Sequence, residues 1–343
     1  MAHDHKPLLV ILEEAGGFEF LAPCLSQLKR PLYGIFSELL IPRVADLKNL
    51  NILPRPSSSN SLTDLMRRNS ISDVLVGTGW GEDLCRQSAR HLKGAGIPFA
   101  SFVDHWTWFR ERFSEIENGS HSRNLELKPN VVFVVDDLAK QRAIDAGFLN
   151  SEIRIVGHPG LERSLNRAQH IVPGPSSVIG FISENYSGDT NLLKLPFSFN
   201  QFTILTELIE IAALRNLHVI IRPHPQEDAA PYAQFVEKNR GKCSLSPRAK
   251  EDFFSSCGIL VGMQSMLLLE GAFVGMRAIS YQPGLRTRDT FVGNILKATQ
   301  ACYELEELAG ALTDTNPWKN GTWSQSFEKS AERMTDALEK LIL

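Results

Sequence analysis

The stretch HVIIRPHPQE, residues 218–227, passes abruptly from an apolar, β-branched run to Arg-Pro-His-Pro. Such a run is typical of a buried strand in a parallel sheet, which presents polar side chains only where it ends. We therefore expect Arg222 and His224 to stand at the carboxyl edge of a sheet, where a bound anion would meet them. The alternative is an ordinary turn between a strand and a helix.

A second stretch, GMQSMLLLEGAFVG at residues 262–275, predicts a turn followed by an apolar helix that carries one carboxylate, Glu270. Backbone N–H groups and a small hydroxyl at the start of a helix form a ready phosphate site. Gln264 and Ser265 occupy that start. Together with the polar strand end, they are expected to hold the diphosphate of a nucleotide, and Glu270 is expected to contact the ribose.

Apolar runs alternate with longer helical segments along the chain, which predicts an α/β fold with parallel sheets. A length of 343 residues favours two domains of roughly 150 residues each. Pro173, Gly174 and Pro175 break regular structure between the two halves, so the boundary is placed there. The expected parts are a first domain at residues 1–165, a linker at 166–177, a second domain at 178–322 and an amphipathic helix at 323–343.

The apolar runs also mark the expected strands. In the first half these are residues 8–12, 34–36, 73–76, 99–103, 131–135 and 153–156, and in the second half 178–182, 218–221, 259–261 and 278–281. A serine-rich stretch at residues 57–61 is expected to form an exposed loop. The apolar stripe of the last helix is typical of core packing, and its acidic polar face argues against anionic lipid as its partner.

Charge and cysteine usage exclude several classes of protein. A formal net charge of −3 leaves no basic stripe, so nucleic acid is not an expected partner. The five cysteines form no Cys-x-x-Cys pair, so neither disulfides nor a zinc cluster is expected. No apolar run has the length of a signal peptide or a membrane helix. The expected location is the cytoplasm, with the inner face of the membrane as the alternative.

A glycine-rich turn follows the first expected strand. In LEEAGGF, residues 12–18, Glu14 stands at the carboxyl edge of that strand. Gly16 and Gly17 allow a tight turn and close approach of a ligand to the backbone. A purely structural turn is the alternative.

A second glycine-rich turn is VGTGWGE, residues 76–82. It lacks the lysine of a P-loop, so triphosphate binding is not expected. Gly79 exposes backbone N–H groups, and Trp80 offers a flat apolar face for a sugar ring. Here too a structural turn is the alternative.

The principal catalytic candidate is SFVDHWTWFRERF, residues 101–113, in which a buried run ends in Asp104 and His105. Asp104 is expected to act as a general base, supported by His105. Trp106 belongs to an apolar wall, and Arg110 and Arg112 would orient a carboxylate or phosphate. The structural alternative is that Asp104 caps the helix that follows.

The Arg-Pro-His-Pro strand end, the serine turn and a later Gly284-x-Arg286-x-Arg288 together resemble the second domain of GT-B glycosyltransferases. Within that superfamily the chain looks closest to the branch of UDP-N-acetylglucosamine 2-epimerases and of capsule and sialic-acid transferases with His-Pro motifs. The resemblance implies two Rossmann-like domains whose parallel sheets face each other across a cleft. It also implies a last helix that crosses back to the first domain, a donor on the second domain and an acceptor on the first.

Two departures bear on the reaction. Glu184 and Asn185 resemble the Arg-Glu-Asn of the epimerases, which implies that they approach the diphosphate. The preceding His-Arg of that motif is missing, and the Glu-Ala-Gly-Leu-Arg of the epimerases is absent near Asp104. These departures favour a transferase on the same scaffold.

No Asp-x-Asp occurs in the chain, so no metal or other cofactor is expected. Arginine, histidine and helix N-termini would then meet the charge of the leaving group. The pair Asp136-Asp137 is expected to cap a helix rather than to bind a metal.

The resulting hypothesis is a metal-independent glycosyltransferase that moves a sugar from a nucleotide-activated donor to a hydroxyl acceptor. Asp104, His105 and Glu14 are the catalytic candidates. By analogy with the family, the acceptor is a glycan or lipid-linked glycan of surface-polysaccharide or lipopolysaccharide biosynthesis, with peripheral membrane association. Two alternatives stay open: a nucleotide-sugar 2-epimerase or hydrolase, and a non-catalytic nucleotide- or glycan-binding protein of a polymer-assembly complex.

Overall fold

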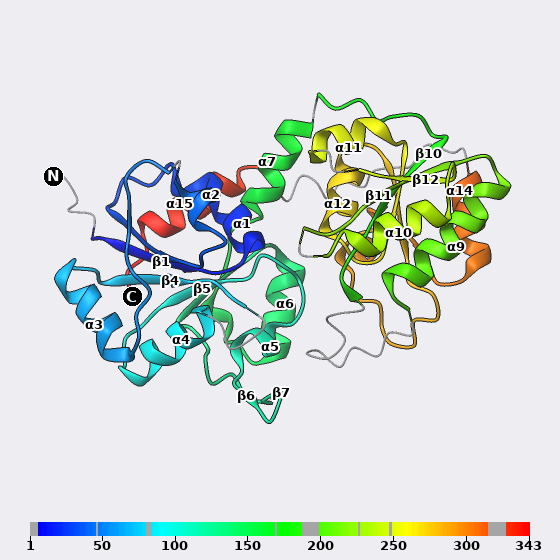
Figure 1. Ribbon diagram of the computed structural model, residues 1–343. Coiled ribbons are helices and arrows are strands. Elements are labelled where there is room, and N and C mark those ends of the chain that lie inside the picture. The colour runs from blue at the N-terminus through cyan, green and yellow to red at the C-terminus, as the bar shows by residue number, and fades with distance from the viewer. Residues whose placement is uncertain are drawn as a thin grey trace. The chain divides into compact units, whose positions relative to one another are not determined.

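The computed structural model describes residues 6–45, 47–79, 84–168, 170–186, 199–225, 227–246, 249–314 and 327–343. The chain forms two compact units (Figure 1). The first consists of Met1–Arg163 and Ser326–Leu343, and the second of Ser164–Gln325. The division falls within helix α7, Pro159–Ala168.

The described part of the first unit holds a seven-stranded sheet in the order β3-β2-β1-β4-β5-β8-β9. Every neighbouring pair of strands in it is parallel. The strands are β1 Leu8–Leu12, β2 Leu32–Phe36, β3 Leu50–Ile52, β4 Asp73–Val76, β5 Ala100–Phe102, β8 Val131–Val134 and β9 Ile153–Ile155. A separate antiparallel hairpin consists of β6 Ile116–Glu117 and β7 Ser120–His121.

Helices cover both faces of this sheet. They are α1 Ala15–Leu25, α2 Ile41–Val44, α3 Ser59–Arg68, α4 Leu84–Gly94, α5 Phe109–Phe113, α6 Asp137–Ala146, α7 and α15 Ser330–Glu339, with the 3-10 turn η1 Asn150–Glu152. Leu9 and Ile11 of β1 pack in one cluster with buried residues of α3 and α4. Successive strand residues point to opposite faces, so Leu8 and Val10 belong to the other side.

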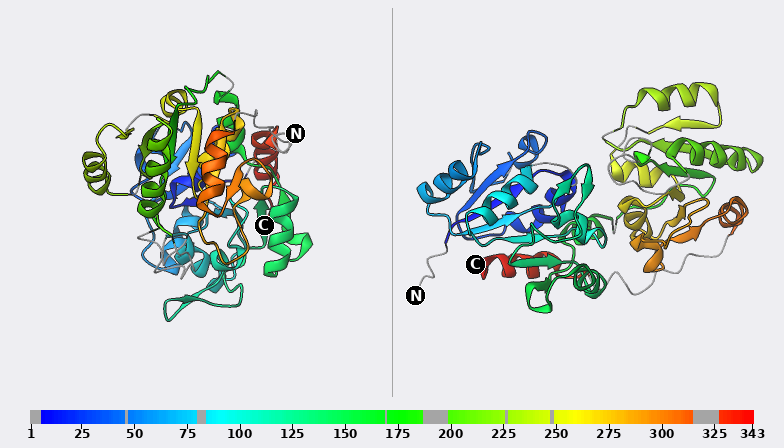
Figure 2. Two further views of the ribbon diagram at one scale, coloured as in Figure 1. Left: turned by 90° about the vertical axis from the view of Figure 1, so that its right-hand side faces the viewer. Right: turned by 90° about the horizontal axis from the view of Figure 1, so that it is seen from below.

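Segments near both ends of the sequence meet in the first unit, where α15 lies beside α1 (Figure 1 and Figure 2). The link is the buried guanidinium of Arg30, which forms an ion pair with the buried Asp73 at the start of β4. Arg30 also donates hydrogen bonds to the carbonyl oxygens of Lys6 at 2.7 Å and Leu338 at 2.8 Å. One desolvated cation therefore joins the N-terminal strand region, the sheet and the C-terminal helix.

The second unit repeats this plan with a six-stranded parallel sheet in the order β12-β11-β10-β13-β14-β15. Its strands are β10 Val178–Ile182, β11 His218–Arg222, β12 Cys243–Leu245, β13 Ile259–Gly262, β14 Arg277–Tyr281 and β15 Gln300–Cys302. The helices in its described ranges are α9 Gln201–Leu214, α10 Ala230–Lys238, α11 Lys250–Ser256, α12 Met266–Phe273, α13 Val292–Ile295 and α14 Leu305–Thr313.

The two faces of the second sheet are packed by different helices (Figure 1). One face meets α9, α10 and α14 in a buried cluster that includes Phe181 and Leu208. The other face meets α11 and α12. Gly180 of β10 is required there, because a Cβ at this position would lie 2.6 Å from the ring of Phe253. Because Gly180 has no side chain, α11 can pack closely against β10.

The predicted α/β fold with parallel sheets is confirmed, and all of the expected strands are present. Sequence reasoning misses β3, β12, β15 and the hairpin. Each of these strands has three residues or fewer, which is too short to show a hydrophobic period. All three missed sheet strands lie at sheet edges, where burial imposes the weakest pattern.

The serine-rich stretch at residues 57–61 was expected to be a loop, and this prediction is wrong in part because α3 begins at Ser59. The hydroxyl of Ser58 accepts from the N–H of Ser61, and the hydroxyl of Ser61 is bonded to the N–H of Ser58. This is a capping box. Serine is favoured both in turns and at helix starts, so composition alone does not separate the two.

The helix expected near the C-terminus is a core element. Met334 and Leu338 of α15 are fully buried, as is Phe327 just before it. Because residues 326–343 belong to the first unit, the prediction that this helix crosses back to the first domain is confirmed. The expected start of the helix, up to residue 326, lies outside the described residues. None of the helices in the described ranges is long and apolar enough to cross a membrane.

Replacing Arg30 by alanine should destabilise the protein by about 3–5 kcal/mol, because the carboxylate of Asp73 is left buried without its cation. Urea unfolding at neutral pH measures the loss. Arg67→Ala is the matched control, since it breaks an exposed ion pair with Asp64 and should change stability by less than about 1 kcal/mol. Equal effects of the two substitutions would show that Arg30 does not anchor the C-terminal helix.

Candidate functional site

Each sheet has one point at which the strand order reverses. In the first unit β1 lies between β2 and β4, and in the second β10 lies between β11 and β13. In open parallel sheets, ligands bind in the crevice at the carboxyl ends of the strands beside such a switch point. The predicted site residues of the first unit follow β1, β4 and β5, and those of the second follow or end β10, β11 and β13. Each unit thus presents its own cluster of predicted residues at one sheet edge.

In the second unit, the turn between β13 and α12 is filled by the carboxylate of Glu184. Its Oε2 accepts a hydrogen bond from the backbone N–H of Gln264 at 2.7 Å. The backbone N–H groups of Met263 and Ser265 also favour the charged form of this carboxylate. The hydroxyl of Ser265 accepts from the N–H of Leu267 and so caps α12. The N–H of Gln264, one of the donors expected to hold a phosphate, is therefore occupied by a side chain of the protein itself.

The protonation of Glu184 is unusual. Burial raises the pKa of this carboxyl to about 7, although the backbone N–H groups of the turn act in the opposite direction. The nearby carboxylate of Glu227 raises the pKa further, because two negative charges repel. Near neutral pH, Glu184 is therefore present in both its charged and its neutral form.

Arg222 and His224 stand at the carboxyl end of β11, as expected. The guanidinium of Arg222 lies over the ring of Phe253, 5.4 Å from its centroid. His224 is exposed, and its backbone N–H donates to Oε2 of Glu227 at 2.7 Å. The other oxygen of Glu227 accepts from the hydroxyl of Tyr232 at 2.6 Å. Sequence reasoning missed Glu227, which braces the loop that presents His224.

Glu270, the expected ribose contact, forms an ion pair with Lys250 at 2.5 Å. Lys250 begins α11 and was not predicted as a site residue, because its partner lies on another helix. Asn185 follows Glu184 at the end of β10 and is half-buried. The side chain of Gln264 donates to Oε1 of the fully buried Gln282 at 2.7 Å, so it is directed into the unit.

In the first unit, Asp104 lies just beyond the end of β5 with its side chain 20% exposed. A Cβ at Gly16 would lie 3.0 Å from Oδ2 of Asp104, so α1 begins directly against the carboxylate. On its other side, Oδ1 lies 3.8 Å from Nη1 of the buried Arg112. Nη1 of Arg112 also donates to the hydroxyl of Thr78 at 2.7 Å. Three loops of the sheet edge thereby converge on one carboxylate.

Helix capping by Asp104 is not observed. The cap position of α5 is Trp108, which makes no side-chain cap hydrogen bond. Arg110 is exposed, whereas Arg112, two residues later on α5, is buried beside Asp104. Sequence reasoning named both arginines but did not show which of them is buried, since a five-residue helix is too short to show which side faces inward.

Two histidines adjoin Asp104. Burial, followed by the charge of Arg112, lowers the pKa of His105 to about 4, and its Nδ1 lies 2.7 Å from the hydroxyl of Thr107. Burial also lowers the pKa of His158 to about 4. Both histidines are therefore neutral at neutral pH.

His158, from the Gly-His-Pro that precedes α7, is a positioning residue for the Asp104 loop. Its Nδ1 accepts from the backbone N–H of Leu161 at 3.1 Å, which places the proton on Nε2. Nε2 then donates to the backbone carbonyl of Asp104 at 3.1 Å. The imidazole ring stacks on Trp106 with centroids 6.2 Å apart.

Trp106, expected to belong to an apolar wall, is fully buried. Its Nε1 donates to Oδ2 of Asp136 at 2.7 Å. The other oxygen of Asp136 accepts from the N–H of Ala139 and caps α6, as was predicted. The buried Trp106 thus connects the Asp104 loop to the start of α6.

The glycine-rich turns lie at the switch point of the first sheet. Glu14 is the half-buried residue that precedes α1, and Gly17 lies against Phe102, whose ring would be 3.3 Å from a Cβ there. The carboxylate of Glu13 accepts the N–H of Leu84 at the start of α4. Trp80 lies outside the described residues.

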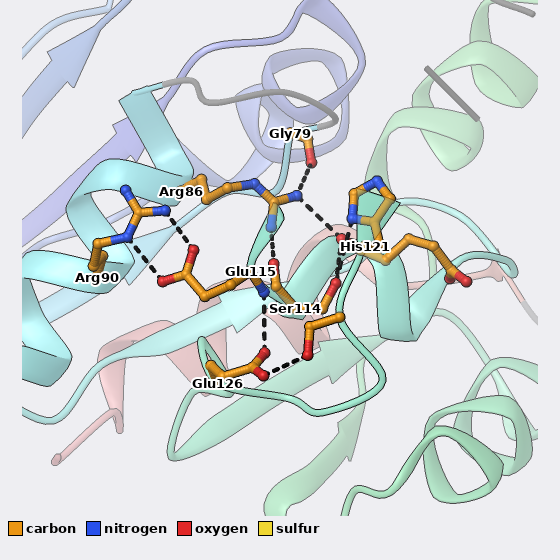
Figure 3. Close-up of polar contacts among 9 residues, drawn as sticks. Gly79, Arg86, Arg90, Ser114, Glu115, His121 and Glu126 are labelled. Carbon is orange, nitrogen blue, oxygen red and sulfur yellow. Dashed lines mark hydrogen bonds and ion pairs between the residues drawn. The ribbon is translucent and has the colours of Figure 1, made fainter. Parts of the chain in front are cut away.

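Figure 3 shows a polar cluster that holds the Gly79 turn and the end of α5 together. The buried guanidinium of Arg86, on α4, donates to the carbonyl oxygens of Ser114, Glu111 at 3.1 Å and Gly79 at 3.4 Å. Beside it, Arg90 forms an ion pair with Glu115, and Ser114 contacts His121. This cluster fixes the segment that carries Arg112, and no sequence motif pointed to it.

No protein-family model matches the chain, and no curated protein matches its sequence. Solved structures match it along nearly its whole length. The UDP-GlcNAc 2-epimerase from Neisseria meningitidis bound to UDP-GlcNAc has a TM-score of 0.65 at 12% identity, covering 98% of this chain and 100% of that one. The UDP-GlcNAc 2-epimerase from Methanocaldococcus jannaschii has a TM-score of 0.59 at 15% identity, with 97% and 99% covered. The protein has the GT-B fold.

A third similar structure is HepE from Anabaena in complex with UDP and glucose, with a TM-score of 0.55, 9% identity, and 98% and 95% of the two chains covered. At such identities the likeness establishes the GT-B fold alone. UDP-GlcNAc 2-epimerases share this fold with glycosyltransferases, so the branch to which the chain belongs stays a prediction.

The buried His158 should make the protein less stable in acid. Its pKa is lowered from 6.5 to about 4, so between these values the unfolded chain binds a proton that the folded chain does not. Stability therefore falls as the pH drops below about 6.5, and at about pH 5 this one group contributes a loss of about 2 kcal/mol.

Urea unfolding of wild type and His158→Gln at about pH 7.5 and about pH 5 checks this expectation. The variant should be less stable at the higher pH, because a backbone link to Asp104 is lost. It should nevertheless lose less stability than wild type on acidification. The same acid loss in both proteins would contradict a neutral, buried His158.

Proposed function

We propose that the protein is a metal-independent glycosyltransferase that binds a nucleotide-activated sugar on its second unit and a hydroxyl acceptor on its first. The observation that carries the proposal is the setting of Asp104. This partly exposed carboxylate is held between Gly16 and Arg112 at the carboxyl edge of a parallel sheet. Deprotonation of an acceptor hydroxyl requires such a positioned base.

The second unit supports the donor half of the proposal. Arg222 and the exposed His224 end one strand, and Lys250 begins a helix of the same unit. Such groups would neutralise the charge that develops on a departing nucleotide diphosphate. Similar solved structures contain UDP or UDP-GlcNAc, which agrees with a nucleotide-sugar ligand. In this mechanism Glu270 exchanges its ion pair with Lys250 for the ribose hydroxyls.

The first unit supplies the base and its surroundings. Because the pKa of His105 is about 4, its imidazole is neutral at neutral pH and serves as a hydrogen-bonding partner rather than as the base. Arg112 forms an ion pair with Asp104, and Glu14 is a further carboxylate of this sheet edge. The proposed acceptor is a glycan or lipid-linked glycan.

The second candidate function is a nucleotide-sugar 2-epimerase or hydrolase, which the epimerase structures of the same fold favour. Such an enzyme needs no acceptor. It would convert the donor alone into a new sugar nucleotide, or into free sugar and nucleotide. Product analysis with and without acceptor therefore separates the two functions.

Thermal unfolding with CMP, CDP, UDP, GDP and their sugar conjugates tests the donor site. A nucleotide at about a hundred times its Kd should add about 2.7 kcal/mol of stability, which corresponds to a rise in Tm of roughly 5 °C. The rise should vanish in His224→Ala and persist in the control His170→Ala, which removes an exposed imidazole elsewhere in the second unit. No rise with any nucleotide would contradict the proposed donor site.

Asp104→Asn should lower turnover of the selected donor by at least about a hundredfold and leave its binding unchanged, because only the base is lost. Gly16→Ala should also slow turnover, since its Cβ would lie 3.0 Å from the Asp104 carboxylate and displace it. Gly94→Ala is the control, because a Cβ there meets nothing within 4 Å. Nucleotide release in the presence of glycan acceptors is the measurement. Unchanged turnover in folded Asp104→Asn would remove Asp104 as the base.

A further inference from the structure

The turn between β13 and α12 already contains a carboxyl group of the protein, that of Glu184. Glu184 reaches it from the end of β10 and accepts the N–H of Gln264 at 2.7 Å, and the nearby N–H groups of Met263 and Ser265 favour its charged form. Each of these N–H groups donates one hydrogen bond. A ligand phosphate in this turn would need the same donors, so the carboxylate and the phosphate cannot both be fully bound.

The surroundings of Glu184 disfavour its charged form, so a ligand can displace this carboxylate from the turn. Among the described residues, the charged group that acts on it is Glu227, which follows β11 and repels its negative form. The turn after β13 contributes only the uncharged Met263, Gln264 and Ser265. Burial and this repulsion raise the pKa of Glu184 to about 7, whereas the backbone donors oppose the rise. Its side chain keeps some exposure to solvent, so a proton can reach it.

We propose that Glu184 is a resident competitor of the donor diphosphate, so that a nucleotide enters this turn only as the Glu184 carboxyl takes up a proton and releases the backbone N–H groups. The inference rests on the donor site proposed above and adds the regulation of that site. The neutral carboxyl no longer repels the phosphate, and it can donate its own O–H to a phosphate oxygen.

The proposal has a quantitative consequence. If only the form with neutral Glu184 binds the nucleotide, the apparent affinity is reduced by the fraction of protein in that form. Above about pH 7 this fraction falls about tenfold for each pH unit, and the affinity falls with it. Near pH 8, binding of one nucleotide should therefore be accompanied by the uptake of about one proton.

Isothermal titration calorimetry in buffers of different ionisation enthalpy measures both quantities. The first probe is UDP-N-acetylglucosamine, whose diphosphate diester does not titrate near neutral pH. Glu184→Gln keeps an oxygen acceptor for the N–H groups but has no charge or proton to exchange, so its affinity should not vary with pH in this way. Glu184→Ala leaves the N–H groups open and should bind more tightly than wild type at about pH 8.5, by roughly tenfold or more. The control Glu210→Gln changes an exposed carboxylate on α9 and should behave as wild type.

The outcomes separate this proposal from the proposed function. Binding by wild type with the same pH dependence and proton uptake as Glu184→Gln overturns the competitor role and leaves the donor site intact. Binding by a Glu184 variant but not by wild type at about pH 8.5 supports both. No binding of any nucleotide sugar by any of the proteins at any pH overturns the donor site, and the competitor role with it.

A ligand-free measurement supplies a second readout. Because the folded-state pKa of Glu184 is raised above its unfolded value, the folded chain binds the proton more tightly between about pH 4.5 and 7, and stability falls as the pH rises through this range. Wild type should therefore lose stability relative to Glu184→Gln on going from about pH 5 to 8. Parallel stability curves would show that Glu184 does not titrate in this window and would overturn the proposal.

Discussion

Backbone N–H groups at the carboxyl edge of a parallel sheet need acceptors, and this protein supplies them from its own carboxylates at both switch points. Glu184 reaches from the end of β10 to the turn after β13. Glu13 reaches from the end of β1 to the N–H of Leu84, after β4. In each unit a glutamate that follows the first strand (β1 or β10) bonds to the loop after the neighbouring strand across the switch point (β4 or β13). The positions of the loops at both edges depend on these two bridges.

The loops that carry the candidate residues lie next to these two glutamates in the chain or contact their neighbours. In the second unit, Ser183 precedes the bridging glutamate, and its hydroxyl donates to Glu227, which in turn holds the backbone of His224. In the first unit, Gly16 follows the bridging glutamate by one turn and lies against Asp104. His158, the residue just before α7, also holds the Asp104 loop through its hydrogen bond to the Asp104 carbonyl oxygen. Side chains from several elements fix one carboxylate, which is the support that a catalytic geometry needs.

The amino-acid sequence was sufficient to predict the fold and the sheet edges at which polar residues gather. Strands of a parallel sheet are buried on both faces and appear as apolar runs in the sequence. The polar residues that end each run are its direct neighbours in the chain, so they can be identified from the sequence alone. The partners of those polar ends are not local. Glu227 and Lys250 act through contacts with residues of other elements, and no spacing in the sequence indicates them. Glu184 bonds to the turn after β13, which was predicted to hold a phosphate, and this bond depends on a residue eighty positions away.

The anchoring of α15 by Arg30 has a consequence for synthesis of the chain. The guanidinium and the carbonyl oxygen of Leu338 are 308 positions apart, and residues 164–325 form a unit of their own between them. On the ribosome, this inserted unit emerges complete while the first unit still lacks the helix that covers α1. Domains generally fold as units during synthesis, and the N-terminal one usually folds first. Here the first unit needs α15, which is synthesised after the whole of the inserted unit, and α1 lacks this packing partner until then.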